Sequence, residues 1–239
     1  MRLDQKMMAV TAILAVSILA GCGSAASSSS VASSAAGSEP ASNVAASSEA
    51  TGQNVVEPIT VNETIDALQN GDGPYMVHAG ITEVSDDGLT LEVYAYDTYE
   101  PDDLASLKAG DVLRTHNEQT GELEDVAIDS IEQDEYGDYN INGGLENGGM
   151  DLARDGGVFR TQVEDDYPVY YKVGDVTLPL AEDAMLEDSS ADPDASIVTT
   201  TGAADVASAI ADNGDWSAYN TTVFVQDGHV FDIQHIWVP

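Results

Sequence analysis

Apolar and polar residues alternate along most of the chain after residue 55, and this period of two predicts β-strands. The clearest stretch is MVHAGITEVSDDGLTLEVYAYD, in which two extended segments flank Asp87-Gly88, a dipeptide typical of hairpin turns. In the second segment an apolar residue stands at every second position, so that one face of the strand is apolar. A second hairpin is expected around residues 227–228.

Shorter segments complete the predicted pattern. Further strands are expected at residues 112–116, 123–131, 158–163, 169–173 and 176–180. One helix is expected at residues 62–70, begun by Asn62, and another at residues 203–211, where Val206 and Ile210 share a face. We therefore predict a mostly β fold with a minor α component: an antiparallel domain, barrel-like or sandwich-like, with two short helices.

A faint repeat raises the question of one domain or two. KAGDV at residues 108–112 and KVGDV at residues 172–176 each place a Gly-Asp pair before a predicted strand. The repeat indicates two β subunits, near residues 55–147 and 148–239. Generic turn chemistry gives the same pattern and is the favoured interpretation. Whether residues 55–239 form one domain or two subunits stays open.

The N-terminal segment has the order of an export signal. Arg2 and Lys6 precede a 14-residue apolar run, Met7–Ala20, which is shorter than the roughly 20 residues that a membrane-spanning helix needs. The run closes with Leu-Ala-Gly-Cys at Cys22, the only cysteine of the chain. This segment resembles the lipobox signal of bacterial lipoproteins. The resemblance implies that residues 1–21 are a signal peptide and that the Cys22 thiol accepts a diacylglycerol.

The segment after the predicted lipid attachment has the composition of a tether. Of residues 23–50, 20 of 28 are Ser or Ala, and no apolar period is present that could offset chain entropy. We expect residues 22–54 to be a disordered linker that holds the domain roughly 30 Å from the bilayer. The predicted location is the extracytoplasmic side of the cell membrane, with the membrane itself as a partner through the lipid anchor.

The charge of the chain limits its partners. It has 7 Lys and Arg against 43 Asp and Glu, a formal net charge of −36. Such a surface repels DNA, RNA and anionic headgroups, so a nucleic-acid partner is excluded. A cell-envelope glycan or protein fits better, and cations are expected to stabilise the crowded carboxylates.

One segment resembles the opening of a calcium-binding loop. Asp138, Asn140 and Asn142 place oxygen ligands at alternate positions before a glycine, and Glu146 falls at the ninth position. The twelfth position, where a bidentate Glu belongs, is Gly149. A polar strand that runs into a Gly-Gly turn also explains the segment and is the favoured interpretation, and calcium is the only cofactor that the sequence suggests.

Catalytic motifs are missing from the sequence, whereas tyrosines gather in acidic stretches. The four histidines lack metal-motif spacing, no GxSxG or phosphate-binding glycine loop is present, and 43 acidic residues make any carboxylate pair uninformative. YAYDTYEPDD and EDDYPVYY combine Tyr with carboxylates, which is typical of sugar binding, although strands favour Tyr in any case.

Three hypotheses for the function of the domain follow. The first is a surface binding or envelope-accessory module without catalysis. The second is an extracellular hydrolase that acts through carboxylates, and the third is a structural spacer stabilised by cations. No motif supports an enzyme, so the first is preferred.

Overall fold

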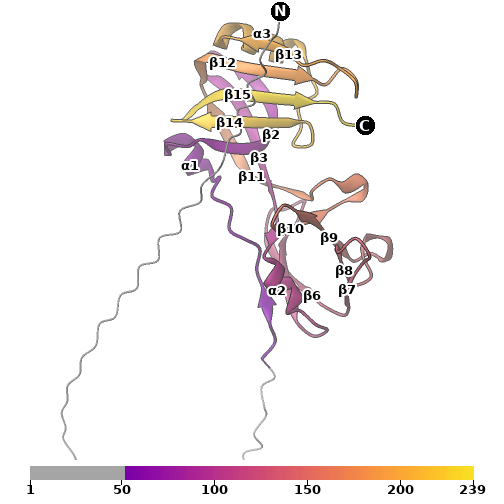
Figure 1. Ribbon diagram of the computed structural model, residues 1–239. Coiled ribbons are helices and arrows are strands. Elements are labelled where there is room, and N and C mark those ends of the chain that lie inside the picture. The colour runs from indigo at the N-terminus through magenta and orange to yellow at the C-terminus, as the bar shows by residue number, and fades with distance from the viewer. Residues whose placement is uncertain (1–51) are drawn as a thin grey trace, which may run out of the picture. The chain divides into compact units, whose positions relative to one another are not determined.

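The computed structural model describes residues 52–239, and these form a mostly β structure with three short α-helices (Figure 1). The helices are α1 (Ile65–Asn70), α2 (Pro101–Ala105) and α3 (Ala203–Asp212), and two short 3₁₀ helices are η1 (Leu145–Asn147) and η2 (Glu164–Asp166). The predicted fold class, β-rich with short helices, is confirmed. All three sheets are open and end at edge strands, so none of them closes into a barrel.

The largest sheet has seven strands in the order β11-β3-β2-β14-β15-β12-β13. Their bounds are β2 (Tyr75–Ser85), β3 (Gly88–Tyr96), β11 (Tyr170–Leu178), β12 (Leu180–Ser189), β13 (Val198–Thr201), β14 (Thr221–Gln226) and β15 (His229–Ile236). All neighbouring pairs are antiparallel except β12 and β15. Alternate residues such as Leu91 and Val93 face a core that Val206 and Ile210 of α3 also enter.

Two smaller sheets surround a second core. One has the order β1-β5-β6 and the other β4-β10-β9-β8-β7. Their bounds are β1 (Val55–Val56), β4 (Thr98–Tyr99), β5 (Val112–His116), β6 (Leu123–Ala127), β7 (Ile131–Gln133), β8 (Tyr139–Ile141), β9 (Met150–Asp155) and β10 (Val158–Gln162). Tyr99, Leu113, Ile141 and Leu152 are fully buried in this core.

The helices differ from prediction in detail. α1 begins after Thr64, whose hydroxyl accepts a hydrogen bond from the backbone N–H of Ala67 at 3.2 Å, so Asn62 is not the cap. α2 is an additional helix. Pro101 stands at its start and two aspartates occupy its first turn, both of which favour a helix N-terminus.

One predicted pair of strands is a single strand. Residues 169–173 and 176–180 were expected to be separated by a turn, but β11 runs without interruption from Tyr170 to Leu178. A β-bulge between Lys172 and Gly174 absorbs the extra residue against β3. The strand continues because its pairing with β3 satisfies the backbone groups that a turn would have used.

Candidate functional site

Aromatic side chains gather on the face of the seven-stranded sheet that points away from its core. In β3, Tyr94 and Tyr96 follow the positions that alternate with buried Leu91 and Val93, and so lie on this outward face. The register pairs His78 of β2 with Tyr94 and Tyr170 of β11 with Tyr96, which places the four rings on one face. We call His78, Tyr94, Tyr96, Tyr170 and Tyr219 the tyrosine face.

The rings of the tyrosine face contact one another in favourable geometry. Tyr170 is at the centre, with ring centroids 5.0 Å from His78, 5.7 Å from Tyr96 and 5.1 Å from Tyr219. The Tyr170–Tyr219 planes meet at 83°, and Tyr219 meets Tyr167 at 88°, both edge to face. Such pairs add roughly 0.5–1.5 kcal/mol each beyond the area they bury.

Carboxylates border the face and hold its phenols. The Tyr94 hydroxyl donates to Glu92 at 3.0 Å, and the Tyr96 hydroxyl donates to Asp155 at 3.4 Å. Glu92 also accepts a hydrogen bond from the Lys172 ammonium at 2.9 Å. The rings are therefore fixed in orientation by groups outside the aromatic cluster.

The tyrosine face is uncharged near neutral pH. Burial raises the pKa of the Tyr94 and Tyr96 phenols, and the neighbouring carboxylates of Glu92 and Asp155 add to that rise. Burial also lowers the pKa of the His78 imidazole, which favours its neutral form. A ligand would meet neutral rings with negative charges at their edge.

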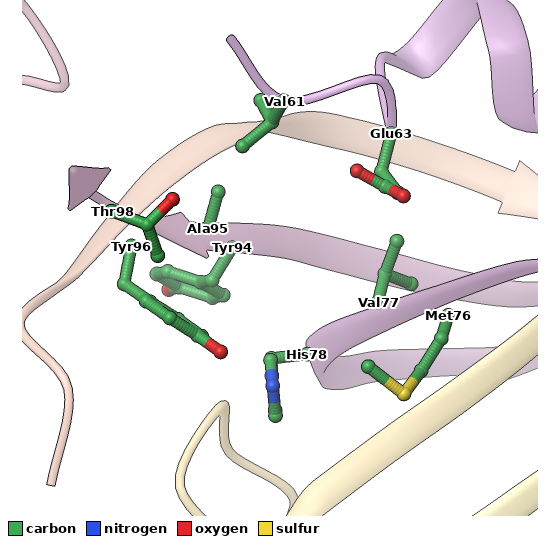
Figure 2. Close-up of a pocket in the computed structure, with 9 residues that line it drawn as sticks. All are labelled: Val61, Glu63, Met76, Val77, His78, Tyr94, Ala95, Tyr96 and Thr98. Carbon is green, nitrogen blue, oxygen red and sulfur yellow. The ribbon is translucent and has the colours of Figure 1, made fainter. Parts of the chain in front are cut away.

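Two pockets adjoin these rings. The first has a volume of about 190 Å³ and is lined by His78, Tyr94 and Tyr96 together with Val61 and Glu63 from the segment before α1 (Figure 2). Figure 2 shows the His78 ring on one side of β2, opposite to the side that faces the Glu63 carboxylate.

The second pocket, which we call the loop pocket, has a volume of about 250 Å³. It is lined by residues of β2, β3 and β11, by the β5–β6 turn and by the loop before β14: Gly80, Glu92, Tyr94, Glu118, Tyr170, Trp216, Ser217, Ala218 and Tyr219. Gly80 presents bare backbone, because a Cβ there would lie 3.3 Å from the carbonyl oxygen of Trp216. Aromatic walls and two carboxylates thus enclose one space.

Hydrogen bonds hold the loop of Trp216 and Tyr219 in place. The Trp216 indole donates to the carbonyl of Asn213 at 2.6 Å, and its ring lies 4.0 Å from that of His235. Asn220 accepts from the backbone of Ser217 at 2.8 Å and donates to the carbonyl of Asp215 at 2.9 Å. The wall of the loop pocket is therefore preorganised.

The predicted calcium ligands are engaged with different partners. Asp138 accepts from the backbone of Arg154 at 2.9 Å, and Asn140 donates to Asp151 at 2.9 Å. Asn142 accepts from the backbone N–H of Asp129 at 2.7 Å. Glu146 lies in η1 and is exposed. Calcium stays a prediction: within residues 52–239, no cluster of three or more His, Cys, Asp or Glu side chains could hold a metal.

The other predicted site residue, Cys22, lies outside the described residues. The acidic tyrosine stretches of the sequence contain Tyr94, Tyr96 and Tyr170. They do not contain Glu118, Trp216 or Tyr219, which reach the loop pocket from distant segments. Only the acidic surroundings of the tyrosines signalled this site in the sequence.

Comparison with known proteins gives no relative. No family model, no curated protein and no solved structure matches the chain. Within residues 52–239, no helix has both the length and the apolar character needed to cross a bilayer.

Proposed function

We propose that the chain is a lipid-anchored extracytoplasmic protein whose domain binds a carbohydrate of the cell envelope at the tyrosine face. The observation that carries this proposal is the loop pocket, where Tyr170, Trp216 and Tyr219 form walls beside Glu92 and Glu118. Because its rings contact one another and its loop is hydrogen-bonded, the pocket requires little ordering when a ligand binds.

The residue types of the loop pocket match the two surfaces of a sugar ring. The C–H faces of a pyranose are apolar and pack against aromatic rings, while its hydroxyl groups donate to carboxylates. Glu92 is paired with Lys172, whose ammonium also contacts Asp175 at 2.7 Å, so the charge of Glu92 is partly offset. Glu118 is exposed and free of such a cation among the described ion pairs. The pocket therefore favours neutral or amino sugars over acidic ones.

The N-terminal segment supports a place close to such ligands. The charged start, the apolar run and the lipobox-like end at Cys22 are the features of a lipoprotein signal. Two acyl chains give stable anchoring, and a tether of residues 22–54 spans roughly 30 Å. A domain on that tether reaches glycans near the membrane surface.

Binding to a panel of neutral and amino-sugar oligosaccharides, measured by isothermal titration calorimetry, tests the ligand. We expect Tyr219→Ala and Glu118→Gln each to weaken binding by about tenfold, corresponding to about 1.4 kcal/mol. Tyr136→Ala is the matched control, because Tyr136 is 78% exposed and lies outside both pockets. Equal losses in all three variants, or no binding to any sugar, would contradict the proposal.

The anchor has its own test. In a bacterial host, the wild-type chain is expected to incorporate labelled fatty acid and to sediment with membranes. Cys22→Ser should abolish both while leaving the domain folded. Labelling that survives Cys22→Ser would reject lipidation at this residue.

A further inference from the structure

Asp97 is a buried carboxylate outside the loop pocket. It lies between β3 and β4, and its side chain is 3% exposed. Its Oδ2 accepts from the Thr115 hydroxyl at 2.9 Å and from the backbone N–H of His116 at 2.6 Å. Its Oδ1 lies 2.7 Å from Nδ1 of His116. A carboxylate that three hydrogen bonds hold in a buried place is firmly oriented.

The contact with Asp97 determines which ring nitrogen of His116 carries the proton. A carboxylate oxygen accepts a hydrogen bond, so Nδ1 carries the proton and the lone pair of the neutral ring is on Nε2. The ring stacks on Tyr171 with 4.0 Å between centroids and 17° between planes. Within residues 52–239, Nε2 of His116 has no protein hydrogen-bond partner. It is also not one of the buried polar atoms that lack a partner. It is therefore open to a ligand.

His116 lines a third pocket, which we call the dyad pocket. Its volume is about 440 Å³. Most of its lining is apolar, from the segment after β1, the β5–β6 hairpin and β11: Pro58, Ile59, Val61, Leu123, Tyr171 and Val173. Thr60 and Thr64 supply hydroxyl groups, and Glu57 and Lys172 are the charged residues of the lining. A mostly apolar pocket with a few polar groups is the usual form of a small-molecule site.

The other histidine that faces a carboxylate shows why His116 is different. Nδ1 of His235 lies 3.3 Å from Asp188, but its Nε2 lies 3.0 Å from the carbonyl oxygen of Asp215. A carbonyl only accepts, so Nε2 of His235 must carry a proton and cannot act as a base. His235 is also almost completely buried.

We propose that Asp97 and His116 form a base dyad that hydrolyses uncharged esters bound in the dyad pocket, with His116 as the catalytic base and Asp97 as its positioning residue. This activity is independent of sugar binding at the tyrosine face. Anionic esters are disfavoured by the net charge of −36, and the apolar lining favours a small acyl or alkyl group.

The chemistry balances with water as the only co-reactant. Nε2 removes a proton from water as the water oxygen bonds to the ester carbonyl carbon. The tetrahedral intermediate then expels the alcohol oxygen with the electron pair of the broken C–O bond. The imidazolium returns its proton to the alkoxide or to solvent, and Asp97 stabilises that imidazolium throughout.

Hydrolysis of p-nitrophenyl acetate by the full chain tests the proposal. We expect His116→Ala to lower kcat/KM by roughly 100-fold or more, the usual contribution of a general base. His229→Ala is the matched control, because His229 is exposed and lies outside the dyad pocket. A wild-type rate equal to that of His116→Ala overturns the proposal.

Chemical rescue separates a catalytic role from a structural one. Added imidazole should restore hydrolysis in His116→Gly, above the rate that the same imidazole gives with His229→Gly. The double variant Asp97→Asn/His116→Gly should weaken this rescue, because a neutral amide at position 97 no longer stabilises the imidazolium that forms. Circular dichroism of each variant checks folding, and the comparison of His116→Gly with His229→Gly holds even if the double variant does not fold. Rescue no larger than in His229→Gly rejects the dyad.

Discussion

Tyr170 of β11 stands directly opposite Tyr96 of β3, and their rings meet at 78° with 5.7 Å between centroids. Cross-strand pairs of this kind are the unit from which a sheet gains stability. Both phenols have a raised pKa, chiefly because of burial, so the pair is neutral over the physiological range. The contact both stabilises the sheet and builds the tyrosine face.

A double-mutant cycle should detect this contact. We expect Tyr96→Leu and Tyr170→Leu to be non-additive by about 0.5–1.5 kcal/mol in the free energy of unfolding, measured with urea. Tyr96→Leu paired with Tyr136→Ala is the control cycle, because Tyr136 lies in the β7–β8 turn. That control should be additive to within about 0.3–0.5 kcal/mol. Equal coupling in both cycles would show that the ring contact has no energy of its own.

Local pattern was sufficient to predict much of the sheet. The period of two in residues 88–96 placed Tyr94 and Tyr96 on the outward face, and Asp87-Gly88 marked the β2–β3 turn. These features depend on side-chain alternation and turn chemistry, which act within a few residues. For the same reason α3 was predicted from the spacing of Val206 and Ile210.

A β-bulge in β15 changes which residues face the core. An uninterrupted alternation along the last strand would place His229, Phe231 and Ile233 on one face. The register instead shifts beside Phe231, and Val230 is buried while His229 is exposed. A bulge inserts one residue and moves the following side chains to the other face, and periodicity alone gives no sign of where it falls.

The sites depend on contacts between distant segments. The sequence gives Asp97 and His116 no common motif, because their shared role comes from a part-buried hydrogen bond between the β3–β4 junction and β5. Trp216 reaches the loop pocket only because Asn220 fixes its loop. No spacing rule along one chain encodes such contacts, and only the tyrosines, which are locally clustered, were visible beforehand.

His78 should make the stability of the domain sensitive to mild acid. Burial lowers the pKa of His78 below the ordinary value of 6.5. Below about pH 6.5, His78 therefore binds a proton in the unfolded chain more readily than in the folded one. The contribution of neutral His78 to the free energy of unfolding is therefore complete above that pH and is lost as the pH falls. Between pH 7.5 and 5.5, the wild type should lose more unfolding free energy than His78→Gln.

The matched control for His78 is His229→Gln, because His229 is exposed. Urea unfolding at a series of pH values gives the comparison, and differences between variants cancel the common titration of the carboxylates. His229→Gln should follow the wild-type curve. A His78→Gln curve parallel to the wild type would show that this ring titrates alike in both states.

The crowded carboxylates give a prediction about salt. Asp138 and Asn142 already accept backbone hydrogen bonds, from Arg154 and Asp129. We therefore expect the Tm of the full chain to rise by the same amount in millimolar calcium chloride and in sodium chloride of equal ionic strength, each measured against chelator. This equality is what screening of like charges produces, since it depends on ionic strength and not on the ion.

The alternative outcome would establish the calcium loop that the sequence suggests. A specific ligand raises Tm in proportion to its differential binding to the folded state, so calcium would then exceed sodium. Asp138→Asn keeps an oxygen that can accept from Arg154 but removes the charge, and it should abolish the excess. Asp129→Asn removes a charge from a neighbouring exposed residue and should leave the excess intact, which separates ligation by Asp138 from general relief of repulsion.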